Sequence, residues 1–205
     1  MIIDRLILGN LQTNCYILAD EQTKECAVFD PAAEAGRIIA AIEKRNLKVK
    51  YIILTHVHID HIMALDELKD LTGAQIVAST AEAELLNDNM GTLAELFSTV
   101  PPCSKADITV SDGDALCLGK SEMKFILTPG HTIGGMCILC GDILISGDTL
   151  FASSVGRTDF PGGSHSQLIS SINDKLMKLD DNVQVYPGHG MPTTIGDERV
   201  GNPFI

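Results

Sequence analysis

The sequence is poor in basic residues. It contains 15 Lys and Arg against 27 Asp and Glu, which gives a formal net charge of −12, and no run of bases occurs anywhere. Nucleic acids and anionic membrane surfaces are bound through clustered Lys and Arg, so both are disfavoured as partners. No pattern in the sequence indicates an oligomeric state.

Long apolar runs and targeting patterns are also missing. No stretch approaches the length of a membrane span, and the first ten residues include an acid, Asp4, unlike a signal peptide. We therefore expect a cytoplasmic protein whose six cysteines are mostly reduced thiols. Cys137 and Cys140 have redox-motif spacing, but they lie in a strand-like run, where residues three apart face opposite sides. We interpret both as structural.

No low-complexity linker or change in composition divides the chain, so we expect one domain over residues 1–205. Apolar runs and turn signals predict strands at 2–8, 14–20, 26–30, 51–55, 75–79, 107–110, 115–119, 123–128, 136–140, 143–146 and 183–187. Helical stripes and capping boxes predict helices at 33–46, 60–73, from residue 79 onward, and 164–179. Strand-rich halves that each carry helices predict two packed sheets with helices outside.

The histidines are unevenly distributed. Three of the six stand in THVHIDH, residues 55–61. Four expected strands each finish in a residue that can bind a metal, often after Gly or Pro: His56, His131, Asp148 and His189. Loops at strand ends converge on one rim, where sites are usually built. His165, in the first turn of an expected helix and without ligand-like neighbours, is interpreted as a plain surface residue.

The spacing of these residues indicates two metal ions. His56 and His58 are two residues apart and can share an ion only from a loop or an extended segment. One ion takes three or four protein ligands. The candidate donors number seven, which suits two ions that share a bridge: His56, His58, Asp60, His61, His131, Asp148 and His189. Asp148 is the expected bridge, because its charge also relieves repulsion between cations roughly 3.5–4 Å apart.

The motifs THVHIDH, PGHT, SGDTL and YPGHG together resemble those of the metallo-β-lactamase superfamily, most closely its glyoxalase II (hydroxyacylglutathione hydrolase) branch. By that resemblance, one ion is held by His56, His58, His131 and Asp148. The other is held by Asp60, His61, Asp148 and His189. Asp30, together with Thr55, would lie behind the ligands and orient them. The implied fold is α+β, a four-layer αβ/βα sandwich in which two mixed sheets carry helices on both outer faces.

This resemblance implies a hydrolase. Two Lewis-acidic ions would lower the pKa of a shared water toward about 7, and the hydroxide formed would attack an acyl carbon. Asp60 would orient this water and Asp148 would bridge the ions, so both are expected catalytic residues. The expected cofactors are two divalent ions, with zinc as the first expectation and iron or manganese as alternatives, because nitrogen and oxygen donors suit all three.

By the same resemblance, the expected substrate is a small thioester such as an S-(2-hydroxyacyl)glutathione. An anionic one suits a positive centre in an acidic protein, because such a centre attracts anions. Arg157 matches a base that contacts glutathione in glyoxalase II proteins; pairing with Asp159 is its alternative role. The chain ends soon after His189, like the compact relatives without a C-terminal helical domain, which supports hydrolysis better than glutathione specificity. The alternatives are a hydrolase of lactones or other esters, a persulfide dioxygenase with one iron, and a non-catalytic metal-binding module.

Overall fold

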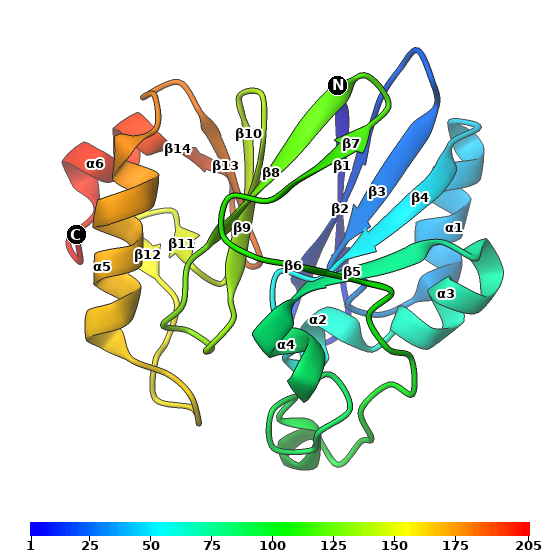
Figure 1. Ribbon diagram of the computed structural model, residues 1–205, viewed down its shortest axis with the longest axis horizontal. Helices are drawn as coiled ribbons and strands as arrows, with labels where there is room; N and C mark the ends of the chain where they lie inside the picture. Colours follow the sequence, from blue (N-terminus) through cyan, green and yellow to red (C-terminus); the bar gives the residue numbers. More distant parts are fainter.

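The computed structural model describes residues 1–205 and contains two six-stranded sheets packed against each other (Figure 1). The strands of the first sheet follow in chain order: β1 (Ile2–Leu8), β2 (Thr13–Ala19), β3 (Glu25–Phe29), β4 (Lys48–Ile53), β5 (Gln75–Ser79) and β6 (Ile108–Val110). The first three form the expected antiparallel meander. From β3 to β6, neighbouring strands are parallel, so the sheet is mixed.

The second sheet is also mixed. Its spatial order is β14 (Thr193–Thr194), β13 (Gln184–Pro187), β10 (Ile143–Gly147), β9 (Met136–Cys140), β8 (Ser121–Leu127) and β7 (Ala115–Leu118). Only β10 and β13 pair in parallel. A separate small hairpin consists of β11 (Leu150–Phe151) and β12 (Ser154–Val155).

Helices cover the outer face of each sheet (Figure 1). Helices α1 (Ala35–Lys44) and α3 (Leu65–Thr72) pack on the first sheet, and α5 (His165–Lys175) and α6 (Ile195–Gly201) pack on the second. Short helical segments complete the chain: α2 (Ile59–Ile62), α4 (Thr80–Leu85), η1 (Ala94–Phe97) and η2 (Leu176–Lys178). The expected four-layer sandwich is confirmed. No helix here is both long and apolar enough to serve as a membrane span.

Apolar side chains fill the three spaces between the four structural layers. Each central strand contributes to two of these spaces, because its alternate residues face opposite sides. In β2, Cys15 and Ile17 pack toward the helices, whereas Tyr16 and Leu18 pack between the sheets. The same alternation applies to β9. Cys137 faces the layer beneath α5 and Cys140 faces the layer between the sheets, so these free thiols lie on opposite faces, as expected.

The predicted helix over 60–73 is wrong in one respect, because the structure divides it into α2 and α3. The break occurs at Met63–Ala64, where the Ala64 N–H donates to the Pro31 carbonyl at 2.9 Å instead of continuing a helical ladder. Gly73 ends α3 in the left-handed conformation, as expected. The elements β11, β12, β14 and α6 were not anticipated from the sequence.

Candidate metal centre

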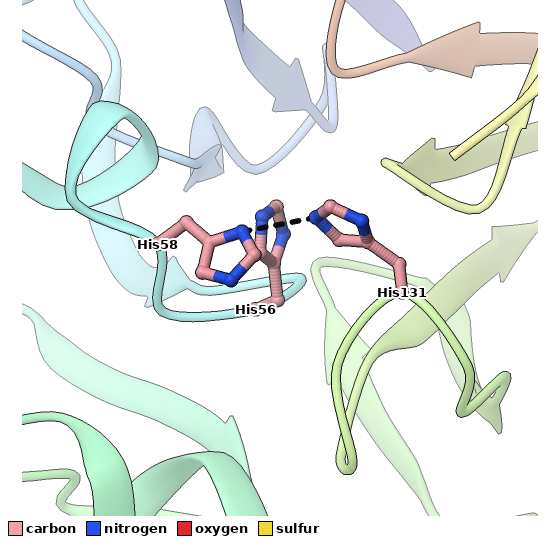
Figure 2. Close-up of side chains that lie close together, drawn as sticks. All are labelled: His56, His58 and His131. Atoms are coloured by element: carbon pink, nitrogen blue, oxygen red, sulfur yellow. Dashed lines mark hydrogen bonds between the residues drawn. The ribbon is translucent and has the colours of Figure 1, made fainter. Parts of the chain in front are cut away.

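The carboxyl ends of four strands bring the candidate donors together. The segment that carries His56 and His58 follows β4 of the first sheet, while His131 follows β8 of the second. Asp148 and His189 follow β10 and β13, also in the second sheet. The donors therefore come from both sheets. Figure 2 shows His56, His58 and His131 directed toward one another from two separate loops.

The first group of donors is made of histidines alone. The ligand atoms of His56, His58 and His131 lie within 4.8 Å of one another, and all three residues are buried. Their ring centroids are 4.6–4.8 Å apart. The Nδ1 atom of His58 lies 3.0 Å from the Nε2 atom of His131 (Figure 2). Three imidazole nitrogens thus share one small volume.

The second group combines a carboxylate with two histidines. The ligand atoms of Asp60, His61 and His189 also lie within 4.8 Å of one another. The Oδ2 atom of Asp60 is 3.3 Å from His189 Nε2 and 3.7 Å from His61 Nε2. His61 is fully buried, whereas the side chains of Asp60 and His189 are 18% and 31% exposed. This group is therefore the one nearer to solvent.

Asp148 lies between the two groups. Its Oδ1 atom is 3.4 Å from His61 Nε2, and its Oδ2 atom is 3.7 Å from both His131 Nε2 and His189 Nε2. One carboxylate thus approaches donors of both groups, which is the geometry required of a bridging ligand. All seven sequence-predicted donors meet in one place.

Hydrogen bonds fix which ring nitrogen of three histidines faces the centre. The Nδ1 atom of His61 donates to Asp30 Oδ2 at 2.9 Å, and that of His131 donates to the Arg157 carbonyl at 2.7 Å. The Nδ1 atom of His56 donates to Thr55 Oγ1 at 3.1 Å, because the Thr55 hydroxyl itself donates to Asp30 at 2.7 Å. Each ring therefore turns its Nε2 atom toward the centre.

Asp30 lies behind the donors, at the position that the family resemblance implies. It is buried, adopts a left-handed backbone conformation, and also accepts the Thr55 N–H at 2.8 Å. Its Oδ2 atom accepts from both His61 and the Thr55 hydroxyl, and so orients His61 directly and His56 through Thr55. Non-glycine residues in this conformation are uncommon and cluster at functional sites.

The centre leaves buried polar atoms without partners, which is the fit expected of a metal site. Four buried side-chain nitrogen or oxygen atoms lack a hydrogen-bond partner, and three of them are His56 Nε2, His61 Nε2 and Asp148 Oδ1. Buried polar atoms are nearly always paired, so three such atoms in one place need an explanation. Nitrogen and carboxylate donors suit zinc or iron. The His and Asp groups are consistent with a dinuclear site.

The ionisation of these groups differs across the centre. Burial, followed by repulsion from His131 and His61, lowers the pKa of His58 to about 3. Burial and the neighbouring His61 likewise hold the pKa of His56 well below its usual value. Burial alone would raise the pKa of Asp148, but the surrounding histidines, led by His61, outweigh it and lower that pKa. By contrast, burial alone would lower the pKa of His61, but the charges of Asp148, Asp60 and Asp30 outweigh it and hold that pKa well above its usual value. Metals bind neutral imidazoles and ionised carboxylates, so His61 would lose a proton when an ion binds.

The sequence did not indicate where the Glu82 side chain would lie. Ser79 caps α4 by accepting the Glu82 N–H at 3.2 Å, as the predicted capping box requires. The Glu82 carboxylate, however, does not complete the box. It is fully buried and accepts the Val57 N–H at 2.8 Å and the Gly134 N–H at 3.0 Å. It therefore ties the loop of His56 and His58 to the loop of His131.

A glycine precedes each donor of the second sheet. A Cβ atom at Gly130 would overlap Leu168, and one at Gly147 would overlap Thr55. At Gly188 it would overlap the Asp148 carboxylate. These three glycines allow neighbouring segments to approach the donor loops more closely than any other residue permits.

The side chain of Arg157 forms the pairing that was its alternative role. Its Nε and Nη2 atoms each donate to Asp159 at 2.7 Å, and its guanidinium lies 4.0 Å from the centre of the Phe160 ring. That ring packs near His58, at 5.8 Å between centroids, so the guanidinium is on the rim of the centre. His165 is exposed at the start of α5 and joins none of the donor groups.

Comparison with known proteins gives consistent matches. A family model described as the metallo-beta-lactamase superfamily matches residues 8–189. The chain is 35% identical to the hydroxyacylglutathione hydrolase GloC of Haemophilus influenzae, over all of this chain and 98% of that protein. The crystal structure of the BLEG-1 B3 metallo-beta-lactamase is 34% identical, covers 99% of each chain and superposes with a TM-score of 0.94. TTHA1623, solved in a di-iron-bound form, is 29% identical, with a TM-score of 0.87 over 98% of this chain and 100% of that one.

Proposed function

This chain belongs to the metallo-beta-lactamase superfamily, and from that premise we propose that it is a metal-dependent hydrolase of anionic thioesters, similar to glyoxalase II. The observation that carries the proposal is the meeting of seven donors with three partnerless buried atoms among them. The name of the GloC relative supports the thioester class. Donor chemistry and family together support hydrolysis.

We propose that the donors divide between two ions as the resemblance implies. The histidine group with Asp148 would hold one divalent ion, and the group of Asp60, His61 and His189 with Asp148 would hold the other. When bound, such a pair supplies Lewis acidity and lowers the pKa of a water between them. Zinc is our first expectation for the native metal, with iron or manganese as alternatives. The reaction adds water across the C–S bond and yields a carboxylic acid and a thiol.

The residues of this chain orient the reactants. The Thr13 hydroxyl donates to Asp60 Oδ2 at 3.4 Å, which steadies a carboxylate that is partly open to solvent. Asp60 would then accept a hydrogen bond from the attacking water and direct the lone pair of the water oxygen at the acyl carbon. Behind the centre, Asp30 and the Arg157 carbonyl hold His61 and His131 at fixed angles.

Charge favours an anionic substrate. Two divalent ions carry four positive charges, against the two ligand carboxylates of Asp60 and Asp148 and one hydroxide, so the ions with these ligands would carry a net positive charge. The remainder of the protein is strongly acidic, with a formal net charge of −12 before metal binding. The centre is then the attractive surface for an anion. The Arg157 guanidinium on the rim would add a further contact to a substrate carboxylate.

The test is turnover by purified protein of known metal content. We expect about two transition-metal ions per chain by elemental analysis, hydrolysis of S-lactoylglutathione, and loss of activity on chelation that metal restores. A protein that binds no transition ion, or a loaded protein that cleaves no thioester, would contradict the proposal. A second candidate, β-lactam hydrolysis, is favoured by the likeness to BLEG-1. A β-lactam and a lactone in the same assay distinguish these activities, and oxygen uptake with a glutathione persulfide tests the dioxygenase alternative.

A further inference from the structure

A cavity adjoins the centre on the side of Asp60. Its volume is about 470 Å³, which is within the usual range for small-molecule sites. The turn between β1 and β2, the segment after β3, α2 and η1 all contribute to its wall. Asp60 and Thr13 form part of that wall, so the cavity is continuous with the residues that would orient the water.

The wall of this cavity is largely apolar. Leu11, Met63 and Phe97 line it, and these side chains come from three separate segments. They are 48%, 58% and 47% exposed, so these large apolar side chains lie at the surface rather than in a core. Isolated exposed apolar residues are ordinary, but several that surround one cavity beside a reactive centre mark a binding surface.

No basic side chain lines the cavity. Its charged residues are Glu34 and Asp60. The carboxylate of Glu34 is already occupied, because it accepts the Gly9 N–H at 3.0 Å and pairs with Arg37 at 2.9 Å. The cavity therefore offers no Lys or Arg partner to a substrate carboxylate or phosphate, which such groups normally require when bound.

We propose that this cavity is an acyl subsite that takes an uncharged, apolar acyl chain of the thioester. The inference rests on the proposed function. The common biological thiol carriers bear carboxylates or phosphates, which this wall cannot pair, whereas an aliphatic or aromatic acyl group is uncharged. The volume of the cavity is also larger than that of a three-carbon hydroxyacyl group. Five heavy atoms at about 30 Å³ each, the volume share of a liquid water molecule, occupy roughly 150 Å³.

The test is a series of thioesters of one uncharged thiol, N-acetylcysteamine, with acetyl, butyryl and hexanoyl groups. Each methylene buried in the cavity should raise kcat/KM by about two- to fourfold. Leu11→Asp and Phe97→Asp each place a charge in the wall and should lower the ratio of the hexanoyl value to the acetyl value about tenfold. Val200→Asp, at a residue 91% exposed on α6, is the matched control and should preserve the selectivity. A flat chain-length profile would overturn the subsite.

Binding to the metal-free protein separates this inference from the proposed function. The neutral fluorophore N-phenyl-1-naphthylamine should bind, and S-hexanoyl-N-acetylcysteamine should displace it at a lower concentration than the S-acetyl compound. Leu11→Asp should remove that difference. Equal displacement by both compounds in the parent protein contradicts the acyl subsite even if thioesters are hydrolysed. Unequal displacement with no turnover of any thioester supports an apolar ligand site while the hydrolase proposal fails.

Discussion

The first sheet supplies four of the seven candidate donors from one short segment, 56–61, whereas the second sheet supplies three donors from three separate loops. In the first region, carboxylates hold the segment in place. Asp30 accepts hydrogen bonds from Thr55 and His61, and Glu82 accepts the N–H of Val57. The segment with the most donors is therefore also held by two buried carboxylates, those of Asp30 and Glu82.

In the second region, each donor depends in addition on close packing at the glycine before it. Each of Gly130, Gly147 and Gly188 precedes one donor and touches a neighbouring segment so closely that a Cβ atom would overlap it. The two regions should therefore fail in opposite ways. The first is damaged when a side chain is removed, and the second is damaged when a single methyl group is added.

The largest effect is expected from loss of a donor in the first region. His58→Ala should lower kcat/KM for S-lactoylglutathione by at least about 10³-fold, because a ligand of the histidine group is gone. Circular dichroism should show an intact fold. His165→Ala, at the exposed histidine outside the donor groups, is the control and should retain full activity. Near-normal turnover in His58→Ala would refute the ligand assignment.

Addition of one methyl group in the second region should come next. Gly188→Ala forces a Cβ atom against Asp148 and near His61, so overpacking should lower the free energy of unfolding by about 1–3 kcal/mol. Metal affinity should fall by about 10–100-fold as these ligands shift. Urea unfolding and metal titration measure both. Gly36→Ala in α1, where an added Cβ meets nothing within 4 Å, should instead be neutral or stabilising by up to about 1 kcal/mol. Equal effects of the two variants on the free energy of unfolding and on metal affinity would contradict the proposed role of close packing in the second region.

Loss of the Glu82 carboxylate, which links the two regions, should have a smaller effect. Glu82→Gln keeps one carbonyl acceptor but turns an NH₂ group toward the N–H of Val57 or Gly134. We expect metal affinity to fall by roughly tenfold, at the lower end of effects from residues behind a ligand. Hydrogen exchange at those two amides should quicken. Glu84→Gln, at an exposed residue of the same helix, should change neither. Unaltered exchange at both amides in Glu82→Gln would show that the carboxylate does not hold the loops.

The smallest effect is expected at the rim. Arg157→Ala should raise KM for anionic thioesters by about two- to fivefold, because an exposed charge pair contributes roughly 0.2–1 kcal/mol. The value of kcat and the KM for an uncharged N-acetylcysteamine thioester should be retained. An unchanged KM for the anionic substrates would leave Arg157 with its pairing to Asp159 as the sole role of its side chain.

The strands and the donor set were accessible from the sequence because both depend on local pattern. Alternating apolar runs located every strand of the first sheet, and the density of donors in 55–61 is visible without any structure. The caps at Ser79 and Ser164 were also predictable, since a side chain and an amide three residues away are enough to form them.

The remainder depended on contacts between distant segments. Helix 60–73 divides because the Ala64 amide meets Pro31, which lies more than thirty residues earlier. Glu82 turns away from its own helix because two loops bring unpaired N–H groups to it. Neither event leaves a local signal, because the partner is chosen by the way the two sheets pack.

The link between His131 and Arg157 is made by the main chain, since the imidazole donates to a carbonyl that any residue at position 157 would carry. The side chain of the same residue extends to the rim and is more than half exposed. Under the proposed function, natural variation or directed evolution would exchange this side chain to admit new substrates while the imidazole keeps its orientation. Selectivity and metal geometry would evolve on separate atoms of one amino acid.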